Sequence, residues 1–220
     1  MPLTVDIETV PLLSSLTLPY PKDERYPPAN YKADEAISKW YASDREKWEK
    51  ECAKAYSVNP RLGRIVCLGT AIDADPVTTT IAATEADEAD LLRTFWAHAE
   101  TCNGHMVTWN GGFDLRFLLI RSLAHQIVPP YSAGFCAEWF AKYKRTTHYD
   151  CKLALTNDFM SKEGLDTWAA FFGLTGKTAG VSGADVFPMH QQGRHAEIAA
   201  YCAQDVETTR TIYTRIKDVL

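Results

Sequence analysis

Residues 3–11 read LTVDIETVP, and the fold assignment starts from this stretch. Apolar and polar residues alternate from Leu3 to Glu8, which predicts a β-strand that Pro11 ends. Side chains alternate along a strand, so Asp6 and Glu8 point to one face and the apolar residues to the other. Two neighbouring carboxylates repel each other, and a cation between them removes that cost. A pair of surface acids on an edge strand is the alternative explanation of this short pattern.

The rest of the sequence alternates helical and extended patterns. We expect helices at 32–56, 85–100, 113–123, 150–158, 165–172 and 195–216, and further strands at 64–72, 77–83 and 105–109. Proline or glycine interrupts the stretches 13–31, 125–147 and 173–193, which are predicted to be irregular. This order of elements predicts an α/β fold with a mixed sheet. We expect one domain over residues 1–220, in which 13–59 forms a loop-plus-helix insertion between strands 1 and 2.

A second pattern, WNGGFDLRFLLIRSL at 109–123, places an acid at the start of a helix. Trp109 ends a strand, the turn Asn110-Gly111-Gly112 follows, and Asp114 lies in the first helical turn. The glycine pair lets the backbone approach a ligand, or the first strand, closely. An acid at this position also interacts favourably with the helix dipole, so the position alone does not establish a site.

A third pattern, YCAQDVETTRTIY at 201–213, lies on the last predicted helix. Tyr201 and Asp205 are four residues apart and therefore share a helix face. They lie at the margin of the apolar stripe, where a side chain can reach a cleft. A hydrogen bond between them on a surface helix is the alternative.

The composition is that of a globular protein. Of the 220 residues, 46% are hydrophobic and 23% are charged, which excludes a disordered, collagen-like or coiled-coil chain. No apolar run is long enough to span a membrane, and the start MPLTVDIETV lacks the basic region of a signal peptide. The six cysteines form no CxxC pair, so we expect a reducing, cytoplasmic location. A net charge of −5 argues against a generic duplex-DNA binder, but not against a nuclease whose acids bind metal ions.

The three patterns, in this order, resemble the DEDD, or DnaQ-like, 3'-5' exonuclease superfamily. The third pattern is Y-x-x-x-D, with tyrosine where other members have histidine. The chain therefore resembles the tyrosine branch of this superfamily. The stretches 6–11 (DIETVP), 60–69 (PRLGRIVCLG) and 165–177 (LDTWAAFFGLTGK) make the chain similar to predicted 3'-5' exonucleases related to the proofreading domain of family B DNA polymerases. The resemblance spans the chain except for 13–59 and 125–147.

This resemblance implies a ribonuclease H-like fold, with a mixed five-stranded sheet flanked by helices. It implies that Asp6, Glu8, Asp114 and Asp205 bind two divalent cations, Mg²⁺ or Mn²⁺, roughly 3.5–4 Å apart across the scissile phosphate. Tyr201 completes the implied catalytic set by orienting the attacking water, since a phenol with a reference pKa of about 10 is a poor base. The implied activity is phosphodiester hydrolysis at 3' ends of single-stranded nucleic acid, with DNA favoured. DNA repair, proofreading in trans and processing are alternative settings.

Substrate contacts are assigned to Thr9, Asn110, Phe113 and Lys177. Phe113 is a candidate for stacking on the terminal base and Lys177 for contacting a phosphate, with core packing and an ordinary loop lysine as the alternatives. The tripeptide GKT at 176–178 lacks the first glycine of a P-loop and follows a helix, which excludes an NTPase.

Two further features of the sequence have competing explanations. The basic residues Lys142, Lys144 and Arg145 either guide a single strand toward the site or form a solvated loop. Asp150 resembles an acid of the family in this region and is expected to be structural.

Other functions compete with a DNA exonuclease. One is an RNA-processing exoribonuclease, because the sequence does not separate DNA from RNA. Another is a non-catalytic scaffold that binds a protein partner through 13–59, although four acids and Tyr201 argue against it. A third is an endonuclease of the wider ribonuclease H-like group, which the Y-x-x-x-D pattern disfavours.

Overall fold

A five-stranded mixed sheet forms the centre of the computed structural model, which describes residues 1–17, 19–141, 144–158, 160–174 and 181–220. The order is β3-β2-β1-β4-β5, with β1 (Leu3–Pro11), β2 (Gly63–Ile72), β3 (Thr78–Ile81), β4 (Met106–Thr108) and β5 (His148–Asp150). The pairs β1–β2 and β2–β3 are antiparallel, whereas β1–β4 and β4–β5 are parallel. This arrangement confirms the predicted α/β class and the mixed five-stranded sheet.

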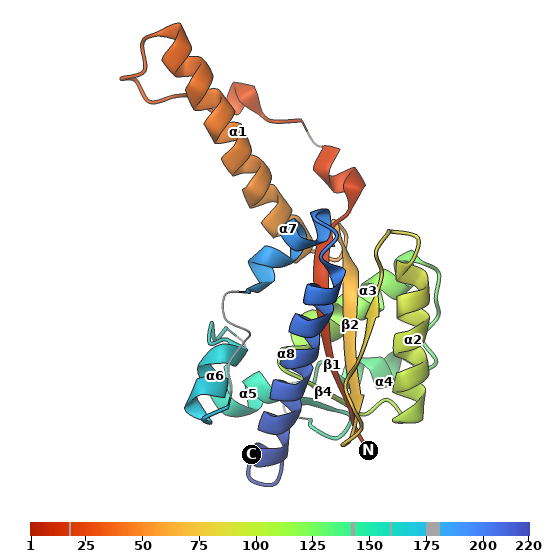
Figure 1. Ribbon diagram of the computed structural model, residues 1–220. Coiled ribbons are helices and arrows are strands. Elements are labelled where there is room, and N and C mark those ends of the chain that lie inside the picture. Colours follow the sequence, from red (N-terminus) through yellow and green to blue (C-terminus); the bar gives the residue numbers. More distant parts are fainter. Residues whose placement is uncertain (18, 142–143, 159, 175–180) are drawn as a thin grey trace.

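Helices cover both faces of the sheet (Figure 1). They are α1 (Asp34–Ser57), α2 (Glu88–Thr101), α3 (Gly111–Ala124), α4 (Ala133–Glu138), α5 (Cys151–Thr156), α6 (Leu165–Phe171), α7 (Val186–Gln191) and α8 (His195–Ile216). One apolar cluster joins α2, α3 and α4 to one face, and a second joins α7 and α8 to the other. In the part of the chain that the structure describes, no helix has both the length and the apolar character needed to cross a membrane.

Strand β1 lies in the middle of the sheet and separates apolar from acidic side chains. Leu3, Val5 and Ile7 are buried in the cluster with α2 and α3, as the alternation predicted. Asp6 and Glu8 therefore point to the face that α8 covers. The register shifts directly after Glu8, where Thr9 pairs with Ile65, so β1 and β2 contain a bulge beside the acids. Bulges of this kind re-aim side chains and increase the local twist.

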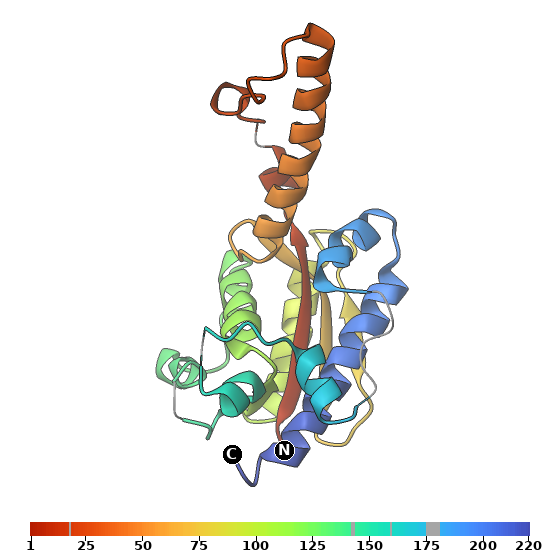
Figure 2. The ribbon, with the colours of Figure 1, turned by 90° about the vertical axis from the view of Figure 1, so that its left-hand side faces the viewer.

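The segment between β1 and β2 projects from the body as an arm (Figures 1 and 2). Its helix α1 matches the predicted helix within two residues at each end. Asp44 holds the arm together, because it accepts a hydrogen bond from Tyr20 at 2.5 Å and pairs with both Nε and Nη2 of Arg25 at 2.5 and 3.0 Å. Both chain ends lie at the opposite end of the body (Figures 1 and 2).

Three short elements correct the sequence predictions. The stretch 125–147 was predicted to be irregular but contains α4, whose aromatic neighbours Tyr131 and Trp139 pack on Trp96 of α2. The predicted loop 173–193 contains α7, in whose first turn Pro188 is tolerated. The helix predicted at 150–158 spans only α5, and the chain before it forms the edge strand β5.

Candidate active site

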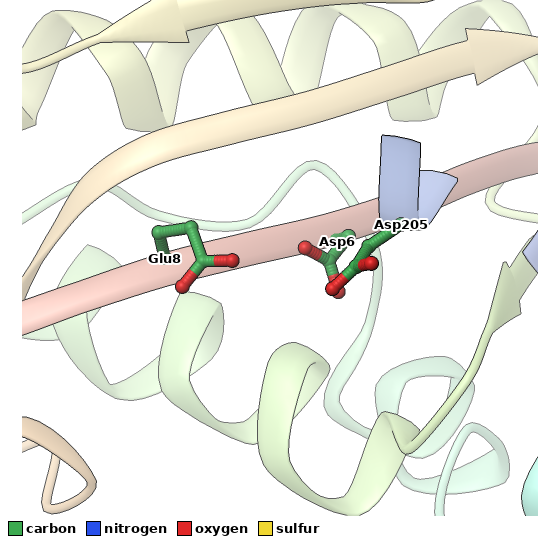
Figure 3. Close-up of side chains that lie close together, drawn as sticks. All are labelled: Asp6, Glu8 and Asp205. Atoms are coloured by element: carbon green, nitrogen blue, oxygen red, sulfur yellow. The ribbon is translucent and has the colours of Figure 1, made fainter. Parts of the chain in front are cut away.

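The carboxylates of Asp6, Glu8 and Asp205 meet on the face of β1 that α8 covers. One oxygen of each lies within 4.8 Å of one oxygen of the others (Figure 3). Glu8 and Asp205 are only 8% and 7% exposed, and Asp6 is half-buried. Three negative charges this close, in a largely desolvated position, strongly favour either protonation or a bound cation.

Gly69 of β2 lets α8 come close enough to deliver Asp205. It is the register partner of Asp6, and a Cβ built on it would lie 2.8 Å from both Cys202 Sγ and Val206 Cγ2. Cys202 consequently packs over β1, with its Sγ 3.6 Å from the Asp6 carbonyl oxygen and 3.5 Å from Asp6 Oδ2. Asp205 follows nearly one turn later on the same helix, which places it beside Asp6.

Asp114 approaches the same strand from α3. It lies in the first turn of that helix, is 4% exposed and hydrogen-bonds with the backbone of Ile7. Its charge acts on both Asp6 and Asp205, so it belongs to the same electrostatic cluster. Among the described residues, it is not one of the three acids whose oxygens meet within 4.8 Å.

Burial and mutual repulsion shift the pKa values of this cluster upward. Burial raises the pKa of Asp6 well above its ordinary value, and the charges of Asp114, Glu8 and Asp205 raise it further. Burial also raises the pKa of Asp114 to about 8, assisted by the charges of Asp150 and Asp205 and opposed by backbone hydrogen bonds. A divalent cation would reverse both effects, because it favours the charged form of each carboxylate.

Tyr201 lies one turn before Asp205 on α8 and is 4% exposed. Burial raises its pKa far above the ordinary value, and the charges of Asp205, Glu8 and Asp6 act in the same direction. Its hydroxyl is therefore protonated at any physiological pH. It can donate a hydrogen bond next to the acids, but it cannot serve as a base.

Two residues of β5 fix the start of α3 and hence Asp114. The Asp150 carboxylate accepts hydrogen bonds from the Gly111 N–H at 2.9 Å and from the Leu153 N–H at 2.8 Å, which agrees with its expected structural role. The Nδ1 of His148 lies 2.6 Å from the Trp139 carbonyl and must donate to it, which leaves Nε2 to accept from the Thr108 hydroxyl at 2.8 Å. A Cβ on Gly111 would lie 2.2 Å from His148 Cε1, so only glycine fits there.

Three supporting residues, Gly69, Cys202 and His148, were not predicted from the sequence. Gly69 stood in an apolar run, although an isolated glycine in a strand often marks a close backbone approach. Cys202 stands among the apolar residues of the last helix, a pattern that indicates packing only. His148 stood beside the basic stretch, yet it is buried and its pKa is lowered by that burial.

The predicted substrate contacts lie around the cluster. Thr9 is buried directly after the bulge, and Asn110 is the half-buried residue before α3. Phe113 is half-buried against the core, with its ring centroid 5.5 Å from that of Phe117. Lys177 lies outside the described residues. Substrate binding by these four residues stays a prediction.

Most of the chain matches one known protein family. Residues 60–219 match the family described as predicted 3'-5' exonuclease related to the exonuclease domain of PolB. The chain belongs to this exonuclease family. The matched range contains Asp114, Tyr201 and Asp205, whereas Asp6 and Glu8 precede it on β1. The structure brings these two parts of the site together. No curated protein matches the chain.

The fold of the chain also resembles part of a solved polymerase structure. The chain is similar to the family B DNA polymerase from the hyperthermophilic archaeon Pyrobaculum calidifontis, with a TM-score of 0.61 and 16% sequence identity. The similarity covers 98% of this chain and 24% of the polymerase chain, so the chain spans about a quarter of that protein. At this identity the likeness concerns the fold alone, and it supports the predicted ribonuclease H-like fold.

Proposed function

We propose that this chain is a metal-dependent 3'-5' exonuclease that removes nucleotides from the 3' ends of single-stranded nucleic acid, with DNA favoured. The observation that carries the proposal is the meeting of the Asp6, Glu8 and Asp205 carboxylates within 4.8 Å, with Asp114 beside them. Membership of a predicted 3'-5' exonuclease family supports the direction of cleavage.

The donor set fits magnesium or manganese. It consists of carboxylate oxygens, which are the ligands that these hard cations prefer over zinc. Asp6, Glu8, Asp114 and Asp205 would hold two such ions. When bound, the ions would supply a water nucleophile at neutral pH and stabilise the charge that develops on the scissile phosphate.

Tyr201 would position the attacking water. Its protonated hydroxyl lies beside the acids and can donate one hydrogen bond with a fixed direction, since burial limits its motion. Thr9, Asn110 and Phe113 would contact the terminal nucleotide from β1 and from the start of α3.

The low exposure of the acids supports the preference for single strands. Glu8, Asp114 and Asp205 are at most 8% exposed, and a frayed single-stranded end would reach such side chains more easily than a paired one. We infer that residues 1–220 act as one exonuclease domain, from which the segment 13–59 projects.

The direct test uses a 5'-labelled single strand with Mg²⁺ or Mn²⁺. The wild-type protein should produce a ladder, and Asp205→Asn should leave the strand intact, whereas the exposed control Asp218→Asn should cut like wild type. An endonuclease would release a few internal fragments. If the wild-type protein cuts neither a deoxyribo- nor a matched ribo-oligonucleotide in either metal, the proposal is wrong. The ratio of the two rates measures the DNA preference.

A further inference from the structure

A small hollow adjoins the carboxylate cluster on the side of β5. It has a volume of about 90 Å³, and Gly112, Phe140, Lys144, Arg145 and Asp150 contribute to its lining. Gly112 precedes Asp114 by two residues on α3, and the Asp150 charge acts on Asp114. The hollow therefore lies close to Asp114, the member of the cluster that α3 contributes.

Two cations lie at this hollow in a chain whose net charge is −5. Lys144 Nζ is 3.1 Å from Glu138 Oε1, with the two side chains 59% and 37% exposed. A surface pair of this kind contributes little free energy, so Lys144 can exchange its partner for a phosphate. The Arg145 guanidinium carbon lies 5.4 Å from the ring centroid of Tyr149, and that ring belongs to the core. Arg145 is thus anchored beside the hollow by a rigid neighbour.

The size of the hollow restricts what it can bind. Pockets that enclose whole small molecules are roughly 300–1,000 Å³, so this one takes a group about as large as a phosphate. The hollow meets the N-terminal end of the 14-residue helix α3 at Gly112, and the positive end of that dipole offsets the Asp150 carboxylate, which accepts from the Gly111 N–H at 2.9 Å. Phe140 is 40% exposed beside it and offers a surface on which a flanking base can stack.

We propose that this hollow binds one backbone phosphate of the substrate strand, upstream of the phosphate that is hydrolysed. The inference rests on the proposed exonuclease function. It adds the path that the substrate strand takes away from the carboxylate cluster. The 3' end enters the carboxylate cluster, whose negative charge the two bound cations would offset. The strand then passes the start of α3, where Lys144 and Arg145 bind the upstream phosphate.

The test neutralises the phosphate and the cations separately and together. The substrates are 5'-labelled deoxyribo-oligonucleotides in which one linkage, the second, third or fourth from the 3' end, is a neutral methylphosphonate. The variant is Lys144→Ala/Arg145→Ala. The control, Lys39→Ala/Lys50→Ala, removes the same charge from exposed α1 lysines that likewise pair with glutamates.

We expect kcat/KM of the unmodified strand to fall about 10-fold or more in Lys144→Ala/Arg145→Ala, chiefly through KM, because the variant can no longer form a charge-assisted hydrogen bond with the phosphate. The control should cut like wild type. One neutral linkage should lower the wild-type rate by a similar factor and cause little further loss in Lys144→Ala/Arg145→Ala. The dependence of log KM on log salt should weaken by about 0.7 for each phosphate that the protein no longer neutralises.

Two results would overturn the inference while the exonuclease function stands. One is a cleavage rate that falls by the same factor whichever linkage is neutral. The other is a loss of cleavage rate that is fully additive when the neutral linkage is combined with the double variant. Additive losses would mean that the two cations do not act on that phosphate. If wild type does not cut the unmodified strand at all, the proposed function itself fails. The wild-type measurements on the modified strands remain decisive even if the double variant is unstable.

Discussion

The Cys202 thiol lies 3.5 Å from Oδ2 of Asp6 and joins the last helix to the first strand across 196 residues of sequence. A hydrogen bond with the Cys67 thiol and burial both raise the pKa of Cys202 well above its ordinary value, so the thiol keeps its proton beside the carboxylate. The same contact fixes α8 against β1 and brings Asp205 to Asp6. The position of Asp205 in the acid cluster therefore depends on how α8 docks on β1.

Replacing one acid of the cluster should abolish cleavage without weakening the metal-free fold. In Asp6→Ala or Asp205→Ala, one of several mutually repelling carboxylates is removed, so the melting temperature in EDTA should be unchanged or raised. Mn²⁺ at about a hundredfold excess over its Kd should raise the wild-type melting temperature by about 5–10 °C, and that of the variants by less. A large loss of melting temperature for both variants in EDTA would indicate structural, not metal-binding, acids.

Removing only the hydroxyl of Tyr201 should cost rate but not stability. Tyr201→Phe keeps the buried ring, so the fold and the Mn²⁺-induced rise in melting temperature should persist. The turnover should fall by roughly 10²–10⁴-fold, as is usual for a group that positions a proton or a water. Tyr213→Phe, on the same helix but half-buried beside Tyr149, is the matched control and should cut normally. Equal activity of the two variants would reduce Tyr201 to a packing residue.

The pH dependence of metal-free stability should differ between wild type and Asp114→Asn. The pKa of Asp114 is raised by burial from 3.8 to about 8 in the folded protein. The folded state thus holds this proton more tightly, so the stabilisation is complete below pH 4 and is lost as pH rises through about 8. Asparagine does not titrate, so the variant should gain melting temperature relative to wild type between pH 5 and pH 9 in EDTA. A constant difference in melting temperature between the two proteins from pH 5 to pH 9 would contradict the raised pKa of Asp114.

Two adjacent glycines should respond differently to alanine. In Gly111→Ala the new methyl group would lie 2.2 Å from His148 Cε1, whereas in Gly112→Ala the nearest atom would be Asn110 Oδ1 at 3.9 Å. Gly111→Ala should lower the free energy of unfolding by about 1–3 kcal/mol, as overpacking does. It should also displace Asp114 and weaken Mn²⁺ binding. Urea unfolding of both variants checks this, and equal midpoints would show that His148 moves away without cost.

Local sequence patterns predicted the long elements well, and they predicted the shared face of Asp6 and Glu8. The last helix was predicted at 195–216, and α8 spans these residues, because its apolar stripe repeats regularly over six turns. The alternation in β1 correctly placed Asp6 and Glu8 together on one face. Both features are local, so the sequence around them contains the required information.

The elements that the sequence did not predict depend on distant contacts. The six-residue helix α4 is too short to show a period, and Tyr131, Phe135 and Trp139 fix it by packing against one another and, through Tyr131 and Trp139, on Trp96. The three-residue strand β5 forms because β4 offers it a parallel edge. The hollow at Lys144 and Arg145 forms only where β5, α3 and the end of α4 come together. The basic residues of the sequence alone therefore could not show whether this segment binds a phosphate or is a solvated loop.

The central claim is that the acid cluster removes nucleotides one at a time from a free 3' end. The most direct measurement compares a linear, 5'-labelled single strand with a circular strand of the same sequence, in Mn²⁺ and in EDTA. The linear strand should shorten by one nucleotide at a time in Mn²⁺ alone, while the circle stays intact. Efficient cutting of the circle would contradict exonuclease action, and equal shortening of the linear strand in EDTA would contradict the metal-dependent site.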